Sequence, residues 1–183
     1  MNFTNQFLVA MPNLADPNFA KTVTYILAHS EDGAMGLVIN RPLEVNFGDL
    51  LEHMNIDTAR HEIKAKPIMQ GGPVEPQRGF VVHEPGGNWD AVMQVEDGLA
   101  VAWSKDILVA LSEGSGPQRT LVTLGYAGWG AGQLENEVLD NSWLNGPADA
   151  NIIFDCPYEQ RWENAARLMG VDIERLSGTA GHS

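Results

Sequence analysis

The segment from Leu124 to Glu135, LGYAGWGAGQLE, concentrates four glycines and two aromatic residues in twelve positions. An apolar run that starts at Thr120 precedes it, and a sequence typical of a helix begins near Ala131. We therefore expect a strand, a glycine-rich turn and a helix. In this arrangement the backbone N–H groups at the start of the helix are able to bind an anion.

The spacing of these glycines matches neither a dinucleotide-binding fingerprint nor a P-loop, and the segment contains no Lys or Arg. Glu135 and Glu137 follow, and their charges would repel a phosphate. Two interpretations stay open. The glycines allow backbone segments to pack closely, which is the favoured interpretation. Alternatively, the segment lines a ligand groove in which Tyr126 or Trp129 offers a stacking face.

Two other loops contain arginine, whose guanidinium matches the geometry of carboxylate and phosphate groups. Arg41 lies within Asn40-Arg41-Pro42 at a predicted strand end, and Arg78 follows the loop Gly71-Gly72-Pro73. These arginines are the best candidates for binding an anion. The competing interpretation pairs each arginine with one of the many carboxylates, and it carries more weight in so acidic a chain.

Acid–base catalysis would require His83, Asp155 or Glu135 to meet in one pocket. Such an enzyme would be a hydrolase or transferase that holds an anionic substrate with Arg41 or Arg78. The five histidines show no metal-ligand spacing. We therefore expect no metal site and no cofactor, and we assign no catalytic residue.

The chain has 183 residues and a net charge of −13, from 24 acidic residues against 11 Lys and Arg. Such a surface repels a phosphate backbone, so direct nucleic-acid binding is disfavoured. The single cysteine, Cys156, excludes an intramolecular disulfide, and we expect it to be a core residue rather than a nucleophile. The apolar run Phe7 to Met11 is too short to span a membrane and has no basic flank typical of a signal peptide. We expect a cytoplasmic protein with no membrane partner.

Hydrophobic periodicity and turn residues predict strands and helices in irregular order. The predicted strands are 6–11, 22–29, 35–40, 68–70, 79–83, 90–95, 120–124 and 151–155, with hairpins joining 22–29 to 35–40 and 79–83 to 90–95. The predicted helices are 47–54 capped by Asn46, a helix from Ser104 to Gly114, 131–139, and 157–170, and residues 55–66 are expected to be a loop. This order favours an α+β fold with a mixed sheet. We expect one domain over residues 1–183, with a frayed tail at 177–183.

Taken together, several segments resemble the AlgH/YqgE family of uncharacterised bacterial proteins. The resemblance lies in Asp16-Pro17-x-Phe19, Gly33 to Pro42, Gly71-Gly72-Pro73-Val74 with Arg78-Gly79-Phe80, Leu124 to Glu135, Asn141-x-Trp143-Leu144 and Phe154-Asp155. It extends from about residue 5 to residue 170. The resemblance implies a compact α+β domain whose mixed sheet curls into a pseudo-barrel with flanking helices. One member is named for a regulatory effect on alginate production, and the resemblance implies no particular reaction.

The residues and the resemblance together predict a non-enzymatic domain that binds a small molecule or a protein partner, with an indirect role in transcriptional regulation. The predicted groove joins the three loops described above to nearby strand ends. Its candidate residues are Asn40, Arg41, Pro42, Gly71, Gly72, Pro73, Arg78, His83, Gly125, Tyr126, Gly128, Trp129, Gln133 and Asp155.

Overall fold

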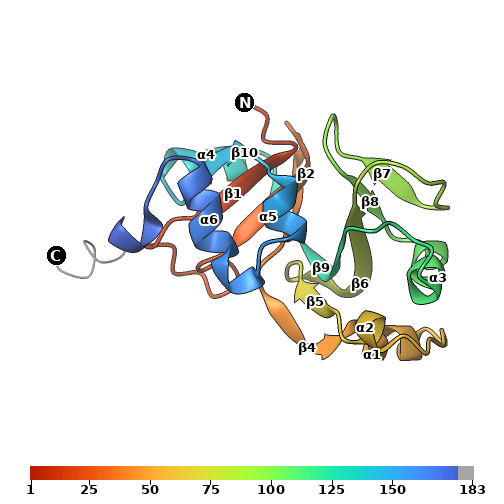
Figure 1. The fold of residues 1–183 in the computed structure, drawn as a ribbon. Helices are drawn as coiled ribbons and strands as arrows, with labels where there is room; N and C mark the ends of the chain where they lie inside the picture. The colour runs from red at the N-terminus through yellow and green to blue at the C-terminus, as the bar shows by residue number, and fades with distance from the viewer. Residues whose placement is uncertain (177–183) are drawn as a thin grey trace.

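A mixed β-sheet of ten strands forms the framework of the protein (Figure 1). The structure is a computed structural model and describes residues 1–176, so the tail predicted at 177–183 lies outside the described residues. The main strand order is β10-β1-β2-β3-β9-β6-β8-β7, with β5 paired to β9 and β4 paired to β5. The strands are β1 (Gln6–Ala10), β2 (Val23–Ser30), β3 (Gly33–Val38), β4 (Pro42–Asn46), β5 (Pro67–Gln70), β6 (Val74–His83), β7 (Val92–Gln94), β8 (Ala100–Ala102), β9 (Thr120–Gly130) and β10 (Trp143–Pro147). The β5–β9 pair is parallel, and the other pairs are antiparallel.

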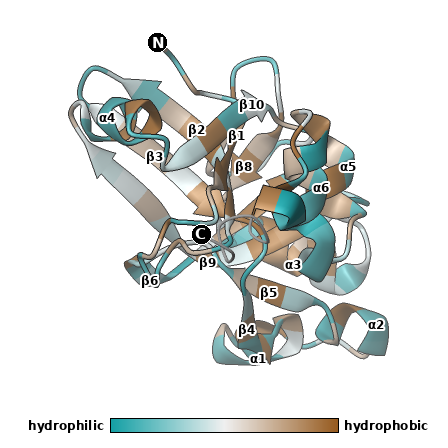
Figure 2. Ribbon diagram, turned by 90° about the vertical axis from the view of Figure 1, so that its left-hand side faces the viewer, coloured by the Kyte–Doolittle hydropathy of each residue, from teal (hydrophilic) through white to brown (hydrophobic). Residues whose placement is uncertain are grey.

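The helices cover this sheet in two groups. In Figure 1, α4, α5 and α6 lie beside β1 and β10, whereas α1, α2 and α3 lie near the β5 and β6 end. Their bounds are α1 (Phe47–His53), α2 (His61–Lys64), α3 (Lys105–Glu113), α4 (Gln133–Leu139), α5 (Ala150–Phe154) and α6 (Arg161–Leu168), with a 3₁₀ turn at Tyr158–Gln160. Figure 2 shows α4 and α6 with one apolar and one polar side, as expected of helices that cover a core.

Side-chain alternation along the strands divides the core into separate clusters. Along β1, Phe7 and Val9 pack toward α5 and α6, whereas Leu8 and Ala10 face the opposite cluster near α4. A third cluster packs α1 and α3 on β5, β6 and β9 through residues such as Phe47 and Ile107. The protein is therefore an α+β domain with a curled sheet, which confirms the predicted fold class.

Several elements were predicted correctly because their local sequence is unambiguous. The hairpin of β2 and β3 forms with Gly33 at its turn, at φ +138°. Helix α1 begins after Asn46, whose side chain accepts the Asp49 N–H while Asp49 accepts the Asn46 N–H, a complete capping box. Helix α3 ends at Gly114 in the left-handed conformation, as predicted.

The glycine-rich segment is not the predicted turn between strand and helix. Strand β9 continues without interruption through Gly130, and only Gly132 precedes α4, at φ +73°. Gly125, Ala127 and Trp129 are buried and the residues between them are more exposed, which is the period of a strand. The glycines therefore belong to the central strand, which pairs with β3, β5 and β6.

Other predicted elements were also wrong. Residues 151–155 form most of helix α5 rather than a strand, because the Asp149 side chain accepts the N–H groups of Asn151 and Ile152 and caps a helix. The predicted second hairpin does not form, since β7 pairs with β8 and β6 pairs with β8 and β9. The short helix α2 lies within the predicted loop 55–66, and β4, β8 and β10 were not predicted.

Candidate functional site

The three loops of the predicted groove do lie side by side. The Gly71 carbonyl accepts the Val38 N–H at 2.8 Å, and the Gly71 N–H donates to the Leu124 carbonyl at 2.8 Å. The Gln70 N–H donates to the Arg41 carbonyl at 2.6 Å, which brings the 40–42 loop to the same place. Pairing of β3, β5 and β9 thus places these segments together.

The polar side chains of the 40–42 loop are occupied by the backbone of a neighbouring loop. Asn40 accepts the Val23 N–H and donates to the Lys21 carbonyl, each at 2.9 Å. Arg41 donates to the carbonyls of Asn18 at 2.6 Å and Ala20 at 3.0 Å. These two side chains therefore hold the loop before β2 in place. Pro42, the last residue of the 40–42 loop, is the first residue of β4.

Gly72 and Gly125 approach each other too closely for any side chain. A Cβ atom on Gly72 would lie 2.1 Å from the Tyr126 carbonyl carbon, and one on Gly125 would lie 2.4 Å from the Gly72 carbonyl oxygen. Gly71 is equally restricted, with 2.3 Å to the Gly125 carbonyl oxygen. These glycines permit close packing of backbone on backbone, the interpretation favoured from the sequence.

Tyr126 and Trp129 do not form one exposed surface on which a ligand could stack. Trp129 is buried and donates its indole N–H to Glu137 at 3.1 Å, and Gln133 donates to the same carboxylate at 2.9 Å. Tyr126 is half-buried and packs edge-on against Phe80, with 6.2 Å between ring centroids. Gly128 and Pro73 lie on the exposed surface nearby.

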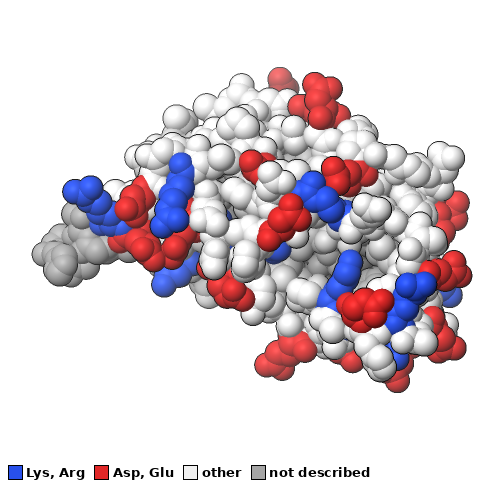
Figure 3. Space-filling model, in the orientation of Figure 1, with Lys and Arg blue, Asp and Glu red and all other residues white. Residues whose placement is uncertain are grey.

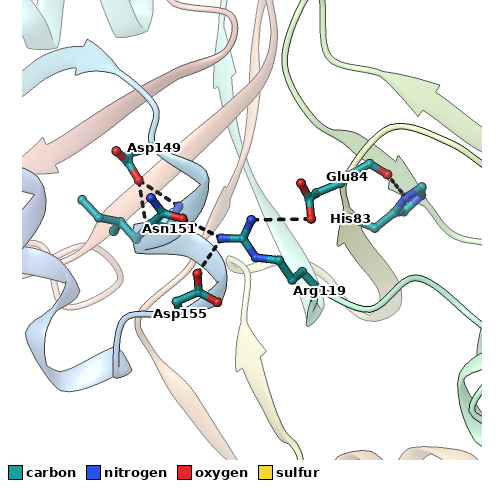
Figure 4. A network of polar contacts seen from close by, with 7 residues as sticks. His83, Glu84, Arg119, Asp149, Asn151 and Asp155 are labelled. Atoms are coloured by element: carbon teal, nitrogen blue, oxygen red, sulfur yellow. Dashed lines mark hydrogen bonds and ion pairs between the residues drawn. The ribbon is translucent and has the colours of Figure 1, made fainter.

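His83 and Asp155 belong to one polar network, but Glu84 and Arg119 lie between them (Figure 4). His83 is buried, and its Nδ1 lies 2.7 Å from the Glu84 carbonyl oxygen, so this nitrogen carries the proton. Arg119 donates to Asp155 at 2.6 Å and pairs with Glu84 at 3.5 Å. Arg119 also donates to Asn151 at 2.8 Å.

The Arg119 network joins the end of α5 to the ends of β6 and β9. The guanidinium lies 5.1 Å from the Phe154 ring centroid, which adds a cation–π contact. Sequence reasoning missed Arg119, because its carboxylate partners Glu84 and Asp155 are far away in the chain. The network connects α5 to β6 and β9. It does not bring the side chains of His83 and Asp155 together at one point where both could contact a substrate.

Glu135, the third acid–base candidate, pairs elsewhere with His29. The His29 Nε2 lies 3.2 Å from the Glu135 carboxylate, and its Nδ1 accepts the Phe3 N–H at 2.9 Å. Because Nδ1 accepts a backbone N–H, the neutral ring carries its proton on Nε2, the nitrogen nearer to the carboxylate. A hydrogen bond from its own backbone N–H, followed by His29, lowers the pKa of Glu135. This pair holds the N-terminal segment against α4.

Arg161 is a buried cation that the sequence did not indicate as structural. Its guanidinium donates to the carbonyls of Ile152 and Cys156, each at 3.0 Å, and to the Ile39 carbonyl. Burial lowers the pKa of Arg161, and the charges of Cys156 and Glu159 oppose that shift. Arg161 thereby ties α6 to α5 and to the end of β3, near the 40–42 loop.

An open apolar groove lies between α1, β6 and α3, outside the three predicted loops. One part of it, about 150 Å³, is lined by Leu50, Met54, Phe80, Trp103 and Leu108 among others. A second part, about 390 Å³, is lined by residues that include Val45, Pro76 and Leu124. Leu50 and Gln77 line both parts, so the two parts lie next to each other.

Trp103 lines this groove, and Arg78 packs on its ring. The Arg78 guanidinium is 5.1 Å from the Phe80 ring centroid and 5.9 Å from that of Trp103. Trp103 is 39% exposed, unusually open for so large an apolar side chain. None of the predicted site residues lines either part of the groove, and Arg78 only packs on two rings that do, those of Phe80 and Trp103. The signal available in the sequence was a tryptophan placed just before the predicted helix cap Ser104.

Two further properties bear on the class of site. Within residues 1–176, no group of three His, Cys, Asp or Glu side chains is arranged to hold a metal ion. The same part of the chain contains no helix long and apolar enough to cross a membrane.

The fold and the groove define a small α+β domain with a curled sheet, flanking helices and an open apolar surface. The chain belongs to the AlgH-like family, DUF179, whose model matches residues 7–174. The resemblance stated from the sequence is thereby confirmed.

Relatives and solved structures agree with this membership. A UPF0301 protein of Nitrosococcus oceani is 50% identical over 99% of this chain and 97% of its own length. One from Thioalkalivibrio sulfidiphilus is 53% identical over 100% of this chain and 97% of its own. The solution structure of the AlgH protein from Pseudomonas aeruginosa superposes with a TM-score of 0.82 at 46% identity, covering 97% of this chain and 94% of that one. A protein from Corynebacterium diphtheriae, at 21% identity and TM-score 0.71 over 94% and 90% of the two chains, shares the fold.

Proposed function

We propose that this protein is a non-enzymatic binding domain that docks a partner protein in the groove between α1, β6 and α3. The observation that carries the proposal is the partly exposed Trp103 at the groove edge, with the Arg78 guanidinium over its ring. Tryptophan and arginine are the side chains that most often dominate the binding energy of protein interfaces.

The shape of the groove supports a protein partner. Its two adjacent parts have walls that include aliphatic and aromatic carbon from Leu50, Met54, Phe80 and Leu108. Exposed apolar surface with a polar rim is typical of protein–protein contacts. Side chains of a partner segment would enter such a groove from the surface.

The contacts of the acid–base and anion-binding candidates support a non-enzymatic role. Arg41 is bonded to two backbone carbonyls, and Asp155 is bonded to Arg119. Glu135 faces His29. A catalytic group must instead be free to reach a substrate, so these residues fit a structural role better.

The charge of the protein supports an indirect role in regulation. On the face shown in Figure 3, Lys and Arg side chains lie among acidic ones and form no broad basic surface. With a net charge of −13, the domain would influence transcription through a protein partner in the cytoplasm and without direct contact to DNA.

Photo-crosslinking in the native bacterium tests the proposal. A photoreactive phenylalanine analogue replaces Val45, which lines the groove and is 43% exposed, and in a control protein it replaces Leu139, which is 68% exposed on α4. We expect a discrete cross-linked partner band from position 45 and none from position 139. Identical adduct patterns at the two positions, or no adduct at 45, would rule out docking at the groove.

A further inference from the structure

We infer that a pocket between α1, α2, α3 and β9 binds a small organic carboxylate, whose charge is balanced by Lys66. Within residues 1–176, Val122 is the one lining residue that this pocket shares with the groove described above. The inference goes beyond the proposed function and does not depend on it.

The pocket is small, and most of the side chains in its walls are apolar. Its volume is about 170 Å³. Phe47, Leu111 and Val122 in the walls are buried, and Ile63 is half-buried. An apolar cavity of about 150 Å³ holds a molecule of the size of benzene, so this pocket suits a ring or chain of about six carbon atoms.

Lys66 lines the pocket with an ammonium group that has few partners. The side chain is half-buried. In the described part of the chain, its single hydrogen bond is a long one, 3.5 Å from Nζ to the Thr120 hydroxyl oxygen. An ammonium has three N–H donors, and a partly buried charge is unfavourable without a charged partner. Thr120 also lines the pocket, and its hydroxyl proton is available to a ligand bound beside Lys66.

The unbalanced charge at this pocket is positive. Among residues 1–176, no Asp or Glu lines the pocket and no ion pair involves Lys66. Glu62 and Glu113, which are adjacent in sequence to lining residues, are exposed. Arg60 does not line the pocket, but its guanidinium lies against Gly114, which does, since a Cβ on Gly114 would lie 2.8 Å from the Arg60 Cζ. An anion is therefore the complementary ligand.

The walls and the single lining cation together define the class of anion. One lysine balances one negative charge, which favours a monocarboxylate over a phosphate group that carries nearly two. The carboxylate oxygens accept from the Lys66 ammonium and the Thr120 hydroxyl, and the ring or chain of the ligand is buried against Phe47, Leu111 and Val122. Inorganic phosphate has no apolar part and gains nothing from these walls.

Titration of the isotope-labelled protein with hexanoate and with benzoate, followed by the NMR shifts of its backbone amides, tests the inference. Hexanol and benzyl alcohol have the same carbon skeletons without the charge, and inorganic phosphate has the charge without the skeleton. We expect saturable shifts centred on Lys66, Thr120 and Gln118 for at least one acid, with binding of its alcohol and of phosphate at least about 10-fold weaker. Binding of the alcohol or of phosphate as tight as that of the acids, shifts centred elsewhere, or no binding of either acid would each overturn the inference.

The charge requirement is measured with Lys66→Met, which keeps an apolar stem and removes the ammonium. We expect its affinity for the acid to fall at least about 10-fold and its affinity for the alcohol to stay unchanged. Lys64→Met is the matched control, since Lys64 on α2 is also half-buried and lies outside the pocket lining, and it should bind as wild type does. Undiminished binding of the acid by Lys66→Met would overturn the role of Lys66.

A second variant keeps the test decisive if Lys66→Met does not fold. Thr120→Val removes the hydroxyl and preserves the shape of the side chain. We expect it to bind the acid at least about 3-fold more weakly, as for one lost hydrogen bond, and to bind the alcohol of the same skeleton less affected. Unchanged affinity of Thr120→Val for the acid would contradict the proposed position of the carboxylate, and the comparison of acid with alcohol needs only the wild-type protein.

Discussion

Trp129 and Trp143 donate their indole N–H groups to the same carboxylate oxygen of Glu137, at 3.1 and 3.0 Å. The two indoles come from β9 and β10, and Glu137 comes from α4. Phe19 contacts both rings, with centroid distances of 5.9 Å to Trp129 and 5.6 Å to Trp143. The tryptophan of the glycine-rich segment is therefore part of an internal clamp that fixes α4 to the sheet.

Removing the shared acceptor should destabilise the protein. Glu137→Ala leaves two indole N–H groups without their charged acceptor, and we expect the free energy of unfolding to fall by about 2–3 kcal/mol. Urea unfolding followed by tryptophan fluorescence measures this change. Glu31→Ala, which removes an exposed acid in a turn, is the control and should unfold as wild type does. Equal stability of the two variants would show that the clamp is not structural.

Two glycine substitutions should distinguish the stability lost through a steric clash from the stability lost through a positive φ alone. Gly72→Ala places a methyl group against the Tyr126 backbone, and we expect a loss of more than about 3 kcal/mol or failure to fold. Gly132 also has a positive φ, but no atom lies within 4 Å of the position that a Cβ would take, so Gly132→Ala should cost only about 1 kcal/mol. Thermal unfolding of the two variants gives the comparison. A larger loss for Gly132→Ala than for Gly72→Ala would contradict the packing argument.

Arg119→Gln should loosen α5 more than it lowers global stability. The guanidinium is 30% exposed and its carboxylate partners more so, so we expect a loss of about 1 kcal/mol or less. Hydrogen–deuterium exchange should nevertheless be faster in α5, whose Asn151 and flanking Asp155 lose their contact. Arg167→Gln, an exposed arginine on α6, is the control. Unchanged exchange in α5 would show that the network does not hold this helix.

Asp106 should make stability depend on pH in the acid range. The Ser104 hydroxyl, followed by the backbone N–H groups of Asp90 and Ile107, lowers the pKa of Asp106. An acid with a lowered pKa stabilises the folded state above its unfolded pKa, about 4, and this contribution is lost as pH falls through the folded pKa. We expect Asp106→Asn to show a shallower loss of stability below about pH 4 than the wild type, in urea unfolding at a series of pH values. Asp32→Asn, in an exposed turn, should follow the wild-type curve.

Sequence patterns predicted the elements whose signals are local. The hairpin around Gly33, the cap of α1 at Asn46 and the glycine end of α3 each depend on a few neighbouring residues. The apolar stripe that includes Ala165 and Ala166 placed α6 on the core for the same reason. Each of these signals is contained within one or two turns of chain.

Two elements were predicted wrongly although the sequence carried a local signal for each, and one contact had no local signal. The apolar residues Ile152 and Ile153 favoured a strand, but the Asp149 cap and packing in the core near α6 made a helix. The glycines of β9 indicated a turn, although the alternation of Gly125, Ala127 and Trp129 was a strand signal in the sequence. The three loops lie side by side, as the hydrogen bonds of Gly71 show, and the groove predicted between them stays a prediction. The hydrogen bond from the Arg41 guanidinium to the Asn18 carbonyl was not predictable, because no local pattern specifies that contact.

The position of β1 between β2 and β10 has a consequence for biosynthesis. The first strand pairs Gln6–Ala10 with Trp143–Pro147, so one of its edges stays open until nearly four-fifths of the chain has been translated. An open strand edge readily pairs with other chains. A chain that ends before β10 would thus leave one edge of β1 unpaired, and we expect such a fragment to aggregate.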